Sequence, residues 1–138
     1  MNENLDQKRA RFAWEKVQQV KMGEYTKLAK STPALIMQSG LMPVLAFLND
    51  KGKDKTHHHH KELLDHLCEW LHKNEQFKER IRGSSFAAVM TALLGDESRD
   101  AAEHARFYQQ ATGETLALLR WIRQFAAATN SEGEGDDD

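Results

Sequence analysis

The sequence is poor in the residues that mark secreted, disulfide-bonded or membrane proteins. It has one cysteine, Cys68, and two prolines among 138 residues, so an intramolecular disulfide is excluded and a reducing compartment is favoured. The N-terminus has no apolar segment typical of a signal peptide. No uninterrupted apolar run reaches the roughly 20 residues that a membrane span needs. We therefore expect a cytoplasmic protein with no membrane segment.

The common sequence motifs of catalysis are missing as well. The chain has no glycine-rich nucleotide-binding loop, no HExxH and no CxxC. Cys68 lies beside an apolar stripe, where a free cysteine usually acts as a small buried hydrophobe. His72 and His104 are isolated among charged residues, and we expect both to be solvated. The sequence thus predicts a protein that is not an enzyme and needs no cofactor or small-molecule substrate.

Four consecutive histidines, His57–His60, invite interpretation as a metal site. Successive residues on a helix point about 100° apart, so this run can surround one tetrahedral ion only in an open loop. No cysteine or carboxylate lies near them at the spacing of a shared ligand set. We expect a solvated loop and no metal site, with a physiological metal site as the less favoured alternative.

The formal net charge of −2 is unevenly distributed along the chain. Residues 130–138 contain five acidic residues, no basic residue and two glycines, a composition that does not build a packed core. The remaining residues hold all 19 lysines and arginines against 16 acidic residues, an excess of three positive charges. We expect a single domain over residues 1–129 and a disordered acidic tail over residues 130–138.

The pattern of apolar residues indicates an all-α protein. No segment alternates with the period of two that a half-buried strand needs, whereas helix-forming residues dominate. Apolar residues recur instead at helical spacing, first in a stripe formed by Ala10, Ala13, Trp14, Val17 and Val20. Further helices are predicted over residues 24–39, 43–49, 59–74, 85–94 and 96–128, with a polar loop at 50–58. The result is a compact bundle of five to six helices.

The most apolar segment, residues 31–50, contains both prolines. Gly40 divides it and predicts a bend between two buried helices, with Pro43 in the first turn of the second helix. Pro33 predicts a kink or a restart within the first of these helices. This segment is predicted to form part of the core.

Basic residues suggest a surface for nucleic acid. Lys8, Arg9, Arg11, Lys16 and Lys21 follow one another along the first helix, and a stripe of this kind can track phosphates. Arg120 and Arg123 flank Trp121 in the last helix and are a second, weaker candidate. The alternative is an ordinary solvated face, because Glu15 interrupts the stripe and the excess charge is small.

Three segments together resemble the small helical subunit of type III-B (Cmr) CRISPR effector complexes. They are Gln7–Val17, then Pro33–Leu41 with Leu45–Leu48, and Thr115–Ala126. The resemblance implies an all-α subunit without nuclease activity. Its partners would be other Cmr complex subunits, further copies of itself, and the backbones of crRNA and target RNA. The basic face implied by the resemblance falls on Lys8, Arg9, Arg11 and Lys16, and after them on Lys21, Arg120 and Arg123.

Two other classes of function remain open at this stage. A helix-turn-helix DNA-binding regulator can also be small, helical and mildly basic, although residues 85–94 lack the Arg, Asn and Gln of a recognition helix. A generic helical scaffold that binds only proteins is the other alternative.

Overall fold

The computed structural model describes residues 3–21 and 23–134, and these residues form helices without any strand. The all-α prediction is confirmed. The elements are α1 (Leu5–Val17), α2 (Glu24–Ser39), α3 (Leu41–Lys51), the 3₁₀ helix η1 (Lys55–His57), α4 (His58–Lys73), the 3₁₀ helix η2 (Glu75–Phe77), α5 (Phe86–Leu94) and α6 (Ala101–Glu134). Among the described residues, no helix is both long and apolar enough to cross a membrane.

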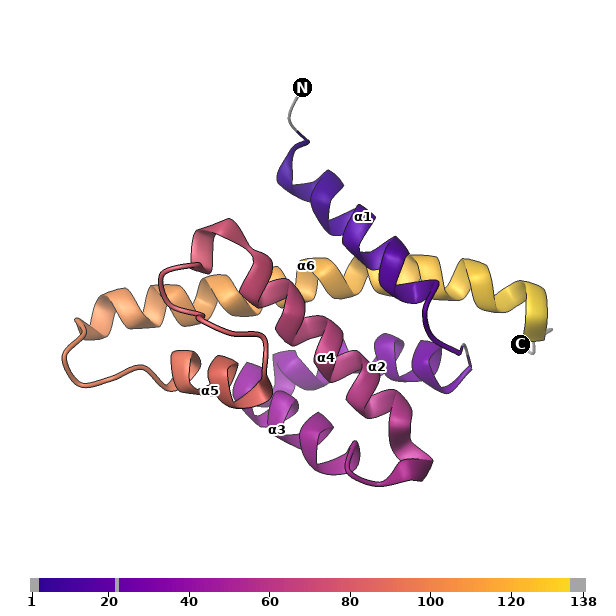
Figure 1. Ribbon diagram of the computed structural model, residues 1–138, viewed down its shortest axis with the longest axis horizontal. Coiled ribbons are helices and arrows are strands. Elements are labelled where there is room, and N and C mark those ends of the chain that lie inside the picture. Colours follow the sequence, from indigo (N-terminus) through magenta and orange to yellow (C-terminus); the bar gives the residue numbers. More distant parts are fainter. Residues whose placement is uncertain (1–2, 22, 135–138) are drawn as a thin grey trace.

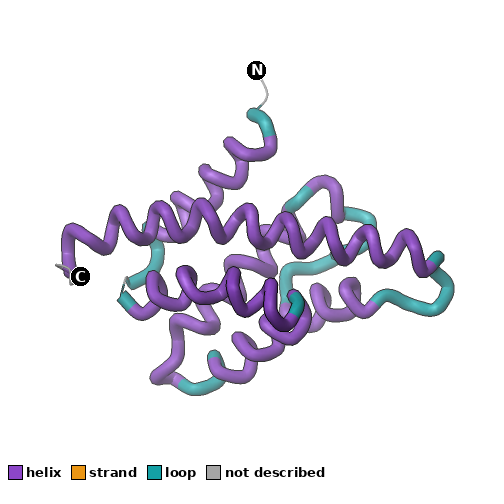
Figure 2. Tube along the Cα trace, turned by 180° about the vertical axis from the view of Figure 1, so that it is seen from behind, coloured by secondary structure: helices purple, strands orange, loops and turns teal. Residues whose placement is uncertain are grey.

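The long helix α6 and the central helix α4 organise the bundle. In Figure 1, α6 runs across the whole molecule and α1 crosses it obliquely, with the first turns of α1 extending beyond the body of the protein. Helix α2 lies along α6 when the molecule is seen from behind (Figure 2). Helix α4 contacts α2, α3, α5 and α6, so its apolar face closes the core from the middle.

The core forms where the apolar stripes of these helices meet. The apolar face of α4 is buried and consists of Leu63, Leu64, Leu67, Trp70 and Leu71. The stripe predicted for α1 is partly wrong. Phe12, Ala13 and Val17 are its buried residues, while Trp14 is 48% exposed and packs its ring edge-on against Phe125 of α6. The oblique crossing on α6 rotates the buried face of α1 away from Trp14.

The corner between α2 and α3 follows the prediction. Gly40 has a φ of 98°, a conformation that residues with a Cβ adopt rarely, and it lets the chain turn from one helix directly into the next. Pro43 is the third residue of α3, where its missing N–H has no helical partner to lose. The Tyr108 hydroxyl of α6 accepts a hydrogen bond from the Met42 N–H at 2.9 Å. Helix α2 passes through Pro33 as one continuous helix.

The histidine prediction requires correction. The polar loop is shorter than 50–58, because α3 continues to Lys51 and η1 begins at Lys55. His58 and His59 form the first turn of α4, and His60 is buried against the ring of Phe47. The histidine run from His58 onward is therefore part of a helix, and His60 is part of the packed interior. In the part of the chain that the structure describes, no three histidine, cysteine or acidic side chains gather as metal ligands would.

His72 and His104 also differ from the expectation that they are solvated. The His72 Nδ1 lies 3.2 Å from the carbonyl oxygen of Ile81, and the His104 Nε2 lies 2.8 Å from that of Leu93. A ring nitrogen that faces a carbonyl must donate its proton. Both histidines are half-buried and connect a helix to a neighbouring segment of backbone.

Helix α6 differs from its predicted limits at both ends. It begins at Ala101, because residues 96–100 form a turn, and it continues to Glu134 beyond the expected end at residue 128. The first five residues of the predicted tail, 130–134, are thus helical. Residues 135–138 of that tail lie outside the described residues.

Candidate nucleic-acid interface

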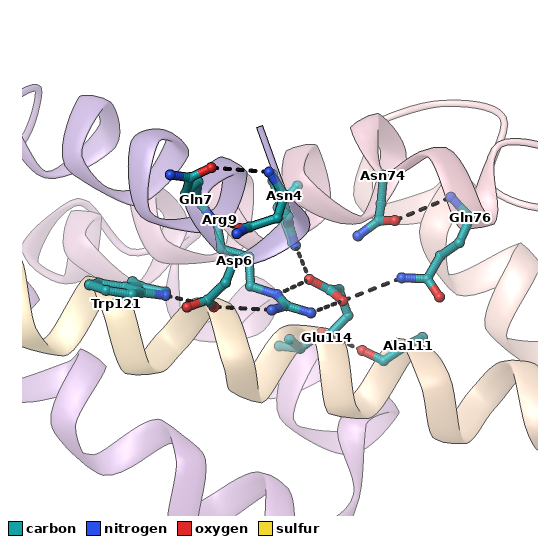
Figure 3. Close-up of polar contacts among 11 residues, drawn as sticks. Asn4, Asp6, Gln7, Arg9, Asn74, Gln76, Ala111, Glu114 and Trp121 are labelled. Atoms are coloured by element: carbon teal, nitrogen blue, oxygen red, sulfur yellow. Dashed lines mark hydrogen bonds and ion pairs between the residues drawn. The ribbon is translucent and has the colours of Figure 1, made fainter. Parts of the chain in front are cut away.

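Arg9, a predicted RNA-binding residue, is held inside the protein by two carboxylates. Its Nε and Nη2 atoms lie 2.5 and 2.9 Å from the two oxygens of Glu114 on α6, and its Nη1 lies 3.1 Å from Asp6 (Figure 3). The Glu114 carboxylate also accepts hydrogen bonds from the Trp70 indole at 3.1 Å and the Gln76 amide at 3.3 Å. All three guanidinium nitrogens are thus hydrogen-bonded to carboxylates, so Arg9 holds α1 against α6.

Lys16, another predicted RNA-binding residue, has a structural partner as well. Its ammonium lies 2.9 Å from Glu69 of α4 and over the ring of Phe12, and its side chain is only 16% exposed. Burial tends to raise the pKa of Glu69, but the hydrogen bond and charge of Lys16 outweigh burial and leave this pKa lowered. Lys16 therefore joins α1 to α4 and offers little free charge to an RNA strand.

The other cations of the first segment remain accessible. Lys8 is exposed and forms no ion pair with any described residue. Arg11 is 65% exposed and pairs with Glu3, and Lys21 is exposed in the connection after α1. The predicted stripe is therefore divided: Lys8, Arg11 and Lys21 can meet a ligand, whereas Arg9 and Lys16 are engaged in packing.

Arg120 and Arg123 are joined by a residue that sequence reasoning missed. Lys30 of α2 lines a groove of about 180 Å³ together with Arg120, Arg123, Gln124 and Ala127 of α6. Among the described residues, no carboxylate lines this groove and its three cations form no ion pair. We call it the basic groove. Lys30 and Arg120 are 90 positions apart, and no periodicity in either helix signals that they meet.

Comparison with known proteins identifies the family. Residues 5–129 match the pattern of the Cas_Cmr5 family, described as CRISPR-associated protein. The chain belongs to the Cmr5 family. It is 31% identical over 127 residues to a CRISPR system Cmr subunit Cmr5 of Thermus thermophilus, an alignment that covers 89% of this chain and 93% of that protein. It is also 36% identical over 79 residues to the Cmr5 of Thermotoga maritima, covering 57% and 58% of the two chains.

Membership of the Cmr5 family confirms the resemblance on which the sequence prediction relied. This chain is thus a protein of the Cmr5 subunit type, like its relatives that are named CRISPR system Cmr subunits. The family also favours this role over the helix-turn-helix regulator considered from the sequence.

The thiol of this Cmr5-family chain is in a position typical of a core residue. Cys68 is 1% exposed, and burial raises the pKa of its thiol to about 12. A thiol with so high a pKa holds almost no thiolate near neutral pH, and the thiolate is the form that acts as a nucleophile. Its surroundings agree with the expectation of a small buried hydrophobe.

Proposed function

We propose that this chain is a non-catalytic structural and RNA-binding subunit of a type III-B effector complex in antiviral defence. In the proposal it stacks with further copies of itself beside the backbone subunits and lines the groove where crRNA pairs with target RNA. It acts in the cytoplasm, as its single cysteine suggests. The observation that carries the RNA contact is the basic groove, because three cations from two helices meet there without an ion pair to any described residue.

The charges in the basic groove suit a sugar–phosphate backbone better than base edges. Two arginines and a lysine in an open groove offer many donors to phosphate oxygens, and such contacts hold a strand without reading its sequence. Guide pairing already reads the sequence in an RNA-guided complex, so the protein needs to recognise only backbone and shape. Lys8, Arg11 and Lys21 are the remaining exposed candidates from the first segment.

Contacts with neighbouring proteins are supported by exposed apolar side chains. Met37 is 77% exposed, Leu94 67% and Phe47 40%. Phe47 also lines an apolar hollow of about 230 Å³ with Leu35, Ser39, Pro43 and Val44, at the outer side of α2 and α3. Exposed apolar patches commonly mark protein interfaces. We place contacts with neighbouring subunits at the hollow beside Phe47.

The test uses the assembled complex. A triple variant, Lys30→Ala with Arg120→Ala and Arg123→Ala, should co-purify with the other Cmr subunits but retain target RNA less tightly at physiological salt. A matched control, Lys27→Ala with Lys61→Ala and Lys78→Ala, removes three exposed lysines that each lie beside a carboxylate and should retain RNA normally. Equal retention by both variants would favour the scaffold that binds only proteins. Failure of the unmodified chain to co-purify would overturn the proposal.

A further inference from the structure

Another hollow lies between α1, the end of α4 and η2. It measures about 440 Å³, and its lining consists of Leu5, Lys8, Trp70, Lys73, Asn74, Glu75 and Gln76. We call it the Asn74 cleft. Of its lining residues only Lys8 was predicted to bind RNA, and the basic groove uses different residues on different helices. The cleft is therefore a separate feature from the basic groove.

The side chain of Asn74 has a hydrogen-bond donor without an acceptor among the described residues, which indicates a ligand. Asn74 is 4% exposed, and its Oδ1 accepts a hydrogen bond from the Gln76 backbone N–H at 3.2 Å. This bond fixes which end of the amide is oxygen. The Nδ2 is then left pointing away from Gln76 (Figure 3), and no described residue accepts its protons. A buried donor without an acceptor is unfavourable. Asn74 is among the residues that line the cleft, so a ligand oxygen bound there would supply the missing acceptor.

The charges around the cleft favour an anion. Lys8 forms no ion pair with a described residue, and Lys73 only shares Glu69, at 3.7 Å, with the closer Lys16. The one acidic residue of the lining, Glu75, is 81% exposed and lies 3.5 Å from Lys78. Two incompletely neutralised ammonium groups and a buried amide donor thus border the same space.

The positive charge continues beyond the cleft. Lys8, Trp70 and Lys73 also line an adjoining hollow of about 210 Å³, which contains Arg11 and Phe12 as well. Two adjacent hollows with shared lysines form a track, and a track suits a ligand with several phosphates in a row better than a single ion. Glu3 and Glu15 line the outer hollow, and their negative charge opposes a phosphate there. The Asn74 cleft is therefore the end of the track that favours a phosphate more strongly.

We infer that the Asn74 cleft binds one phosphodiester of a single-stranded RNA segment, whose oxygen accepts from Asn74 Nδ2 while Lys8 and Lys73 balance its charge. The inference rests on the proposed function, since it names an additional position where the RNA strand meets this subunit. The neighbouring phosphates of the strand then follow the outer hollow toward Arg11.

The test measures the Asn74 side chain directly. Isotope-labelled full-length protein is titrated with hexauridylate, and NMR follows the side-chain NH₂ signals of Asn74 and the indole N–H signals of Trp70 and Trp121. The Asn74 and Trp70 signals should shift saturably. The Asn74→Ser variant keeps an oxygen that can accept from Gln76 but removes the donor, so binding at Trp70 should weaken roughly five- to tenfold. The control Asn49→Ser, on α3, should bind as the unmodified chain does.

Several outcomes would overturn the inference. Unshifted Asn74 signals, or equal affinity of Asn74→Ser and Asn49→Ser, would remove the RNA contact at this cleft. Equal response to inorganic phosphate at the same phosphate concentration would indicate a site for the free anion. Stronger binding of hexaglutamate than of hexauridylate would indicate an acidic protein partner. If the Asn74 NMR signals do not shift while the basic-groove triple variant still loses RNA in the complex, the inference fails and the proposed function stands. If that triple variant retains RNA normally, the proposed function fails.

Discussion

Arg9 and Glu114 lie 105 positions apart and join α1 to α6 through a bidentate ion pair. Glu114 is 4% exposed and lies on the apolar stripe of α6, between Ala111 and Leu118. A carboxylate taken out of water needs a cation and further donors around it, and Arg9, Trp70 and Gln76 provide them. Arg9, in the most basic part of α1, therefore stabilises the fold, and its charge is not free for an RNA strand.

This ion pair gives the first prediction. Arg9→Met leaves Glu114 buried without its cation and should lower the free energy of unfolding by about 3 kcal/mol or more. Its neighbour Lys8 is exposed, so Lys8→Met should change stability by no more than about 0.5 kcal/mol. Urea denaturation of the two variants checks the difference. Equal stabilities would mean that the pair does not hold α1 in place.

The same pair limits how RNA binding can be tested. Reversing the charges of Lys8, Arg9, Arg11 and Lys16 together would break contacts with Glu114 and Glu69 as well as remove positive surface. A loss of RNA in such a variant would not distinguish unfolding from lost contacts. Variants confined to Lys8 and Arg11, or to the basic groove, are the informative ones.

Local sequence signals predicted most of the fold. Helix α2 has the predicted limits and Gly40 ends it as expected, while Ser85 caps α5 through the Ala88 N–H and Gly95 ends that helix. These features depend on residues close together in sequence. Periodicity was less reliable for α1, because the burial of Trp14 depends on the angle at which α1 crosses α6.

The candidate sites could be predicted only in part. Arg120 and Arg123 were visible as a basic pair, but Lys30 approaches them only because α2 packs along α6. A signal for Arg9 was present in the sequence: Glu114 at the buried position of an apolar stripe requires a partner from another helix. Which cation takes that place depends on the tertiary structure.

The second prediction concerns the salt dependence of RNA binding. If the three cations of the basic groove each neutralise one phosphate, the triple alanine variant should bind oligouridylate with a log K versus log salt slope smaller by roughly 2. The slope is measured by fluorescence anisotropy between low and physiological salt. The triple lysine control described above should keep the slope of the unmodified chain. An unchanged slope in the groove variant would show that phosphates do not bind there.

The third prediction is a loss of stability in mild acid through His66. Burial first, and then the charge of Lys16, lowers the pKa of His66 from 6.5 to about 4, and the Tyr25 hydroxyl lies within hydrogen-bond distance of its Nδ1, at 2.8 Å. Burial also raises the pKa of Tyr25, so this hydroxyl stays protonated. The unfolded chain takes up the proton at a higher pH than the folded chain. The stability contributed by neutral His66 is therefore complete above pH 6.5 and is lost as the pH falls toward 4.

The size of this loss can be measured with a matched pair of variants. A shift from 6.5 to about 4 corresponds to about 3 kcal/mol, at roughly 1.4 kcal/mol per unit. His66→Gln should flatten the fall in the free energy of unfolding between pH 6.5 and 4. Some slope should remain, since burial and the charges of His59 and His57 lower the pKa of His60 as well. His58→Gln, at a side chain 70% exposed, should leave the slope unchanged; an identical effect of both variants would contradict the assignment.

The last prediction contrasts two glycines. Gly113 lies within α6 at an exposed position, and a Cβ added there would meet no atom within 4 Å. Gly113→Ala should therefore raise the free energy of unfolding by about 0.5–1 kcal/mol, because alanine loses less backbone entropy in a helix. Gly95 has a φ of 73°, and a Cβ there would lie 2.6 Å from the His104 ring. That ring is held by the Leu93 carbonyl, so Gly95→Ala combines backbone strain with a clash and should cost about 2 kcal/mol or more. Urea denaturation measures both. Stabilisation by Gly95→Ala would mean that the connection from α5 to α6 can rearrange, since only a shift of His104 or of the turn makes room for the methyl group.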